Sequence, residues 1–298
     1  MNPVPARCRF TRPADWIAAR IARLPQAWLL RLGALLAGLG APLLRRRRRI
    51  AARNLELCFP ELDRAARERL LRETLRDTVT GALETLRAWF APADALRGLY
   101  AVEGLEHLAR ARAAGRGVLL VTGHLTHFEL AGRVLGDASG QPVSLLARRH
   151  NDPCLDRWID AARRRAFSST IAKKDKAALL DALRGGAAVM YLGDQDFSYH
   201  NAFVPFFGVA ASTLTALPGL LAESGAVALP VWMQRLADGS YRLRIEPQWA
   251  GWPGGDPTAD AARYMAELEA VVREAPSQYL WVHRRFKTRP PGEPDPYA

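Results

Sequence analysis

Cysteine is scarce in this chain, and other features that would mark a particular class of protein are missing as well. The three cysteines, Cys8, Cys58 and Cys154, lie far apart and form no CxxC pair, so neither a disulfide scaffold nor a zinc ribbon has support. There is no internal repeat and no low-complexity linker. With 49% hydrophobic and 24% charged residues, the composition is that of a globular protein and excludes a disordered chain or a multi-span membrane protein.

Acidic residues are also in short supply, mainly near the N-terminus. The chain has 42 Lys and Arg against 30 Asp and Glu, which gives a net charge of +12. Residues 1–60 contain twelve arginines, but Asp15 and Glu56 are their only acidic residues. Nearly all of the positive excess therefore belongs to the first fifth of the chain.

Within this basic region lies an apolar stretch, residues 27–44, and five arginines at 45–49 follow it directly. A bilayer span needs about 20 residues, so this stretch, interrupted by Arg31 and Pro42, is at the lower limit. Arginines beside an apolar helix favour anionic lipid, and nucleic-acid-binding arms lack such an apolar neighbour. We predict attachment to a membrane, single-pass or monotopic, with residues 45 onward in the cytoplasm and with no nucleic-acid partner.

Beyond residue 60 the pattern is that of an α/β domain. Apolar residues at helical spacing predict one long helix over 61–90. Alternating strands and helices then predict a mostly parallel sheet flanked by helices, with the last two strands forming a hairpin at an edge. The simplest division is a membrane-associating segment, 1–60, and an α/β domain, 61–298. The expected strands are 117–122, 142–147, 187–192, 226–233 and 240–247, and the expected helices start near 127 and cover 153–166, 213–224 and 257–274.

Candidate catalytic residues follow the first of these central strands, in the segment VTGHLTHFEL at 121–130. Ligands of open α/β sheets bind at the carboxyl ends of the strands, where His124 and Glu129 are expected. A histidine base with a carboxylate to orient it can take a proton from a hydroxyl. The alternative is a structural histidine at a helix N-terminus. A metal site that adds His127 is a further alternative, but the spacing is not H-E-x-x-H, and we predict no metal.

Two more segments follow strands. Residues 148–165 carry Arg148 and Arg163, whose planar guanidinium groups suit phosphate, although an exposed arginine-rich helix has the same composition. Asp194, Gln195 and Asp196 end a buried strand, and acidic side chains at such a place can hold substrate hydroxyls, arginines or a cation. The FVPFFG loop at 203–208 supplies core residues or lines an apolar channel.

Together these segments resemble the late acyltransferases of lipid A biosynthesis, the lauroyl and myristoyl transferases. The matching segments occur in the family's order and cover about residues 45–293, and they look closest to the lauroyl branch. They are RNLELCFPE (53–61), TGHLTHFEL (122–130), NDPCLD (151–156), GDQD (193–196), FVPFFG (203–208) and QYLWVHRRFKTRPPGE (278–293).

The resemblance implies a glycerol-phosphate-acyltransferase-like fold with a membrane-associated N-terminal helix, and an enzyme without a cofactor at the cytoplasmic face of the cell inner membrane. It implies transfer of a fatty acyl group from an acyl carrier protein thioester to a hydroxyl of a lipid A precursor. His124 would deprotonate the hydroxyl, and Glu129 would orient the histidine. Arg163, with Arg148, would hold a phosphate, and the GDQD segment would bind substrate.

Other functions are possible for the same sequence. The same chemistry on another glycolipid or a lysolipid differs only in the acceptor. A non-enzymatic membrane or nucleic-acid-binding protein would use the arginine run, but it would leave GHLTHFE and GDQD without a purpose.

Overall fold

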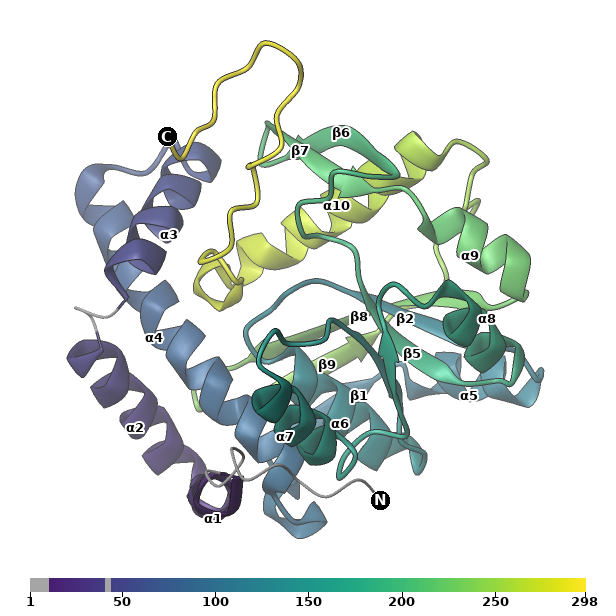
Figure 1. Ribbon diagram of the computed structural model, residues 1–298, viewed down its shortest axis with the longest axis horizontal. Coiled ribbons are helices and arrows are strands. Elements are labelled where there is room, and N and C mark those ends of the chain that lie inside the picture. The colour runs from purple at the N-terminus through teal and green to yellow at the C-terminus, as the bar shows by residue number, and fades with distance from the viewer. Residues whose placement is uncertain (1–10, 41–43) are drawn as a thin grey trace.

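The computed structural model describes residues 11–40 and 44–298 and shows helices on both faces of a central sheet (Figure 1). The α-helices of the described residues are α1 (Thr11–Ala22), α2 (Gln26–Leu39), α3 (Arg45–Cys58), α4 (Arg64–Phe90), α5 (Leu105–Ala113), α6 (Phe128–Ser139), α7 (Pro153–Arg163), α8 (Lys176–Arg184), α9 (Leu217–Ser224) and α10 (Pro257–Glu274). The same part of the chain also forms two short 3₁₀ helices, η2 at Ala93–Leu96 and η3 at Pro276–Gln278.

The main sheet has the strand order β1-β9-β8-β2-β5-β3-β4, and every neighbouring pair is parallel except β8 and β9. A separate antiparallel pair, β6 and β7, packs near α10 (Figure 1). The strands are β1 (Tyr100–Glu103), β2 (Val118–Thr122), β3 (Ser144–Ala147), β4 (Thr170–Ala172), β5 (Ala188–Leu192), β6 (Asn201–Phe206), β7 (Val209–Leu214), β8 (Val227–Arg235) and β9 (Tyr241–Ile245).

The central strands are buried on both faces, which explains their continuous apolar sequences. In β2, Leu119 and Val121 belong to one core while Val118 and Leu120 belong to the other. Side chains of a strand alternate between the two faces, so a strand covered on both sides must be apolar at every position. This is the mostly parallel sheet that the alternating sequence pattern predicts.

The N-terminal helices α1 and α2 pack along the long helix α4 rather than standing apart from the α/β domain (Figure 1). Ala18 and Ala22 of α1 are buried in the same core as the end of α4. Gln26, at the start of α2, donates hydrogen bonds to the carbonyl oxygen of Gly239 (2.7 Å) and to the hydroxyl of Tyr241 (2.9 Å). The N-terminal helices therefore pack against the domain that follows. The division of the chain near residue 60 remains a prediction.

Some details differ from the sequence-based expectations. The predicted hairpin of β8 and β9 is present, but it is not at an edge, because β1 pairs in parallel outside β9. The segment expected as a loop before residue 213 forms the β6–β7 hairpin, and α9 starts only at Leu217. Within residues 11–40 and 44–298, no helix has both the length and the apolar character needed to cross a membrane.

Candidate active site

The two most important polar segments of the site follow neighbouring strands of the sheet. β2 and β5 pair in parallel, with Thr122 opposite Leu192 at their carboxyl ends. His124 lies two residues after Thr122, and Asp194 lies two residues after Leu192. The register of the two strands therefore brings His124 and Asp194 together. Tyr264 of α10 holds both turns, because its hydroxyl donates to the carbonyl oxygen of Thr122 (2.7 Å) and accepts from the backbone N–H of Gly193 (3.3 Å).

The turn that carries His124 is fixed by close packing. At Gly81, α4 comes so near that an added Cβ would lie 2.3 Å from the carbonyl oxygen of Thr126. The same turn pairs with the C-terminal segment, since Thr126 donates its backbone N–H to the carbonyl of Gln278 and Leu280 donates to the carbonyl of His124. The histidine therefore sits on backbone that is held from two sides.

Asp194 makes the decisive contacts with His124. Its Oδ1 lies 2.6 Å from Nδ1 of the ring, and its Oδ2 accepts the backbone N–H of His124 (2.9 Å) and the hydroxyl of Tyr279 (2.9 Å). Both Asp194 and Tyr279 are buried, whereas 17% of the His124 side chain is exposed. The carboxylate is thus enclosed, and the imidazole is left partly open.

The electrostatics of this pair define the tautomer of the histidine. Burial by itself raises the pKa of Asp194, but the charge of His124 and the hydrogen bonds from His124 and Tyr279 lower it to about 2. An ionised carboxylate can only accept hydrogen bonds, so Nδ1 of His124 carries the proton and Nε2 is left as a proton acceptor. This arrangement is suited to general-base chemistry on a hydroxyl.

Glu129 has a different set of partners from the one that the spacing suggests. It lies in the first turn of α6 and is buried, where it accepts hydrogen bonds from Arg163 (2.6 and 3.3 Å) and from the indole N–H of Trp89. The group that fixes the ring of His124 is Asp194 and not Glu129. The predicted orienting role of Glu129 is therefore replaced by an ion pair with Arg163, whose guanidinium also lies over the Trp89 ring at 5.7 Å.

His124 lies in the wall of a cavity of about 270 Å³. Apolar side chains from β3, β5, α6 and the loop after β5 form much of the lining, and several cationic groups lie among them. Of the predicted site residues, the cavity brings together His124, Arg148, Arg163 and Gln195. Such a space suits a substrate with a long apolar part and a polar reacting end.

Two basic side chains of this cavity, Arg148 and Lys173, form no ion pair with the residues that the structure describes. The pKa of Lys173 is lowered, first by partial burial and then by the positive charges of Arg148 and Lys174. A bound anion would relieve this repulsion. Arg148 and Lys173 therefore suit the phosphate that was predicted for Arg163, because the guanidinium of Arg163 is already paired with Glu129.

The other predicted residues have structural contacts. Asp196 accepts hydrogen bonds from the backbone and hydroxyl of Thr288 (both 2.9 Å) and so ties down the C-terminal segment. His127 is fully buried with its Nε2 2.8 Å from the carbonyl oxygen of Met233, and burial lowers its pKa. Among the described residues, no three His, Cys, Asp or Glu side chains are grouped as metal ligands.

Sequence reasoning did not assign roles to Tyr279 and His283, which both come from the C-terminal segment. The backbone N–H of Asp196 donates to Nε2 of His283 at 3.4 Å. Burial, and then the charge of His124, lower the pKa of His283 to about 4, so this ring feels the charge of the His124–Asp194 pair. Both residues lie within the QYLWVHRR motif, and this motif is the sequence feature that could have indicated their place near the site.

The sequence profile of the bacterial lipid A biosynthesis acyltransferases matches residues 14–288 of this chain. The chain belongs to this family. It is 39% identical over 307 residues to the lipid A biosynthesis palmitoleoyltransferase of Escherichia coli (strain K12), an alignment that covers 98% of this chain and 99% of that protein.

Other branches of the family are similar as well. The lipid A biosynthesis lauroyltransferase of Escherichia coli (strain K12) is 35% identical, over 93% of this chain and 91% of that protein. The myristoyltransferase of the same organism is 28% identical, over 97% of this chain and 92% of that protein. The lauroyl branch is thus among the relatives, and the chain is an acyltransferase of lipid A biosynthesis.

Proposed function

We propose that this enzyme transfers a fatty acyl group from an acyl carrier protein thioester to a hydroxyl of a lipid A precursor, at the cytoplasmic face of the inner membrane. The observation that supports it most directly is the contact between His124 and Asp194 in the wall of an apolar cavity. A base held in one tautomer beside an apolar space is what O-acylation by a fatty acyl donor needs.

In the proposed reaction, Nε2 of His124 removes the proton of the acceptor hydroxyl as its oxygen attacks the thioester carbonyl. The new C–O bond forms while the carbonyl π electrons move to oxygen, which gives a tetrahedral intermediate. The intermediate collapses, the C–S bond breaks, and the leaving thiolate takes the proton from the imidazolium. Asp194 stays ionised and stabilises the imidazolium between these steps.

Direct transfer is favoured over a covalent acyl-enzyme. Cys58 is buried, and its pKa is raised chiefly by that burial, so its thiol stays protonated. In this proposal, Nε2 of His124 acts directly on the acceptor hydroxyl, and no side chain of the enzyme carries the acyl group between donor and acceptor. Arg148 and Lys173 supply positive charge at the same cavity for a phosphate group of either substrate.

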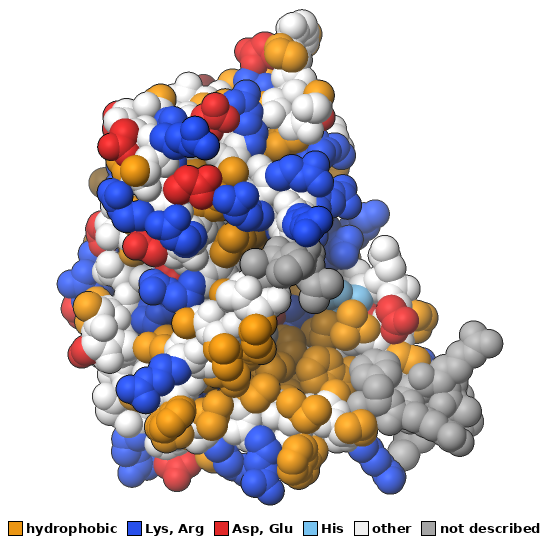
Figure 2. Space-filling model, turned by 90° about the vertical axis from the view of Figure 1, so that its left-hand side faces the viewer, with side chains coloured by type: hydrophobic (Ala, Val, Ile, Leu, Met, Phe, Trp, Pro, Cys, Tyr) orange, Lys and Arg blue, Asp and Glu red, His pale blue; other side chains and the backbone are white. Residues whose placement is uncertain are grey.

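The exposed surface of α1 and α2 supports attachment to a membrane. Trp16, Trp28 and Leu39 are exposed by 63%, 59% and 70%, and Leu35 beside them is also exposed. Figure 2, which views the side of the molecule that carries α1 to α4, shows hydrophobic side chains gathered over its lower half. Exposed apolar patches of this kind bind membranes or other proteins.

Charged neighbours favour a lipid surface for this patch. Arg20 lies over the ring of Trp16 at 5.0 Å, and Arg31 lies over the ring of Trp28 at 5.2 Å. Aromatic and basic side chains together suit the headgroup layer. Since α2 has 14 residues and rises about 21 Å, it is shorter than the roughly 30 Å hydrocarbon core, and we propose that it lies in the interface.

The reaction is tested with purified enzyme in detergent, a series of acyl carrier protein thioesters and a tetraacyl lipid A precursor, with products identified by mass. The expected product is heavier by one acyl chain, and its mass reports the chain length. The same assay with a lysophospholipid as acceptor separates the alternatives. Product from the lysophospholipid alone would contradict the proposed acceptor, and use of coenzyme A thioesters alone would contradict the proposed donor.

A further inference from the structure

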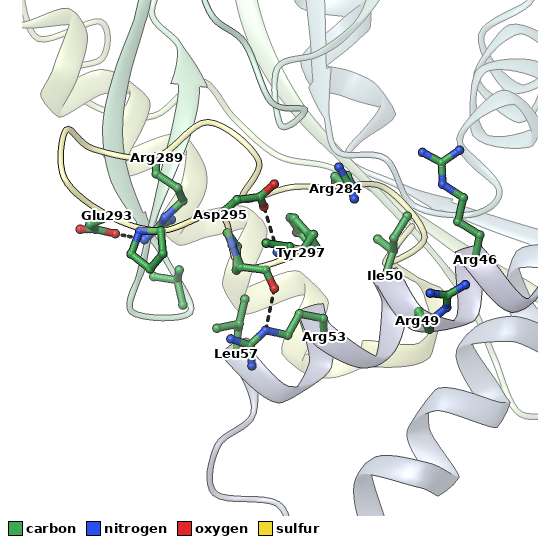
Figure 3. A pocket seen from close by; sticks show the side chains of 14 residues that line it. Arg46, Arg49, Ile50, Arg53, Leu57, Arg284, Arg289, Glu293, Asp295 and Tyr297 are labelled. Carbon is green, nitrogen blue, oxygen red and sulfur yellow. Dashed lines mark hydrogen bonds and ion pairs between the residues drawn. The ribbon is translucent and has the colours of Figure 1, made fainter.

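A groove larger than the His124 cavity lies between α3 and the C-terminal segment and has a volume of about 850 Å³ (Figure 3). Five arginines line it: Arg46, Arg49, Arg53, Arg284 and Arg289. The first three come from one face of α3, Arg284 belongs to the QYLWVHRR motif, and Arg289 comes from the segment that follows it. The remaining lining is largely apolar.

Part of this charge is already neutralised. Arg289 pairs with Glu293, and Arg53 pairs with Glu56 at 2.6 Å. Asp295, the other acidic side chain of the groove, accepts the backbone N–H of Tyr297 (2.9 Å). Two further contacts join the C-terminal segment to α3: Arg53 donates through Nε to the carbonyl oxygen of Pro296 (3.0 Å), and the hydroxyl of Tyr297 donates to the side-chain oxygen of Asn54.

Arg46, Arg49 and Arg284 have no carboxylate partner in the described part of the chain. Arg284 lies over the Tyr297 ring at 5.2 Å, but its buried Nε finds no hydrogen-bond acceptor there. Figure 3 shows Arg46 and Arg49 on α3 and Arg284 on the C-terminal segment around the same opening. Unpaired cations from two separate elements that meet at one groove repel each other unless an anion binds between them.

The position of Arg46 adds to this demand for an anion. The first turn of α3 consists of arginines and has no acidic residue. The N-terminal end of a helix carries a partial positive charge, so arginines there are unfavourable without a bound anion. A phosphate is the natural ligand, since guanidinium groups bind it in a bidentate manner.

The groove and the His124 site share one short stretch of backbone. Asn54 of α3 donates to the carbonyl oxygens of Trp281 (2.6 Å) and His283 (2.7 Å). The Nε2 atom of His283 accepts the backbone N–H of Asp196 (3.4 Å), two residues after Asp194, and the next residue, Arg284, lines the groove. The same stretch of chain therefore contributes to both places.

We propose that this groove binds a phosphate group of the acceptor glycolipid while an acyl-chain hydroxyl of the same lipid lies at His124. The inference rests on the proposed function for its choice of lipid. A concave site with partly apolar walls suits a headgroup that enters it better than it suits the surface of an acidic protein. Three of its arginines, Arg46, Arg49 and Arg53, also follow α2 closely in the chain, and α2 carries the exposed apolar surface.

The test uses the double variant Arg46→Gln/Arg49→Gln in the full chain. Both arginines are exposed and make no ion pair with the described residues, so the variant is expected to fold, with a thermal midpoint equal to or slightly above that of the wild type because charge repulsion is relieved. The matched control is Arg97→Gln/Arg110→Gln, which removes the same charge from exposed positions outside the groove. Binding to detergent micelles is measured with a bisphosphorylated tetraacyl lipid A precursor and with the same lipid lacking one or the other phosphate.

We expect the groove variant to bind the bisphosphorylated lipid about tenfold or more weakly, since each lost charged contact is worth roughly a factor of ten. Removing the relevant phosphate should weaken wild-type binding by a similar factor and leave the groove variant almost unaffected. The control should bind the lipid as the wild type does. In the groove variant, the KM for the acyl carrier protein should stay within about twofold of the wild-type value. Millimolar inorganic phosphate should not replace the lipid.

Other results would overturn the proposal. If the control variant bound the lipid as weakly as the groove variant, the arginines would act only by general attraction of anions. If the groove variant bound the lipid normally but had a higher KM for the acyl carrier protein, the groove would be assigned to an acidic protein. Strong binding of inorganic phosphate without lipid would assign it to the free anion. A wild-type enzyme that shows the phosphate-dependent binding but transfers no acyl chain would contradict the proposed function and leave the groove assignment intact.

Discussion

The Nδ1 atom of His124 lies 2.6 Å from Oδ1 of Asp194, although the two residues are 70 positions apart in the chain. The parallel pairing of β2 with β5 creates this contact, because each residue follows the end of its strand by two positions. The pair, rather than His124 with Glu129, is the unit on which the proposed chemistry depends. Variants of its members should therefore behave differently from variants of residues that only support the fold.

Replacing Asp194 with Asn should abolish most of the activity. An amide can donate to Nδ1 and so favour the tautomer that has its proton on Nε2, which is the wrong one for a base. By analogy with a catalytic triad, we expect kcat to fall about 10³- to 10⁴-fold with little change in the acceptor KM. Initial rates at saturating donor measure this.

Asp196→Asn is the matched control for that variant. It weakens the contacts with Thr288 and should lower the melting temperature, but kcat should change less than about tenfold. Equal losses of kcat in the two aspartate variants would argue against a special role for Asp194.

Tyr279→Phe removes one of the donors to the Asp194 carboxylate. The hydroxyl is buried 2.9 Å from Oδ2, and its loss should cost about 1 to 2 kcal/mol of stability. With fewer donors, the pKa of Asp194 should rise from about 2 toward that of the unfolded chain. The loss of unfolding free energy between about pH 4 and pH 2 should then be smaller than in the wild type. Unfolding free energy measured against pH tests this, and identical pH dependence in the two proteins would show that Tyr279 has only a packing role.

Glu129 and Arg163 should behave as one unit. Glu129→Ala leaves a largely buried guanidinium unpaired, so a loss of about 3 to 5 kcal/mol of stability is expected. In a double-mutant cycle of Glu129→Gln and Arg163→Gln, the double variant should be little worse than either single variant in stability and rate. If Glu129 acted on His124 independently, the rate losses would add up instead.

His283 should make the fold sensitive to mild acid. Its pKa of about 4 is below the ordinary 6.5, mainly because of burial. The unfolded chain therefore binds an extra proton between pH 6.5 and 4, and stability is lost as the pH falls through this window. In His283→Gln, the loss of unfolding free energy between pH 7 and pH 4.5 should be smaller by about 1 to 3 kcal/mol. Parallel pH curves for the two proteins would contradict this assignment.

Much of the fold could be predicted because the central strands are buried on both faces and therefore have continuous apolar sequences, such as GVLLVT at 117–122. The missed strands lack this signal. β4 has only three residues, and β6 contains Pro205, whose missing N–H argues against a strand. The edge position of the hairpin was wrong because β1, a four-residue strand, comes from a distant part of the chain.

The site was predictable in its location but not in its pairings. His124 and the GDQD segment were correctly expected at the carboxyl ends of strands, but only the strand order shows that β2 neighbours β5. Glu129 is near His124 in sequence, yet the chain folds so that Arg163 reaches it from α7. Tyr279 lies after the last helix, where no periodicity marks it.

The most direct test of the central claim is acyl transfer by His124→Gln, in the assay with acyl carrier protein thioester and tetraacyl lipid A precursor, read by product mass. Glutamine keeps a polar side chain that can contact Asp194 but offers no base. We predict that wild-type enzyme yields a lipid heavier by one acyl chain and that the folded variant, with unchanged lipid binding, yields it at least about 10³-fold more slowly. Product formation by this variant at close to the wild-type rate would contradict the proposed role of His124.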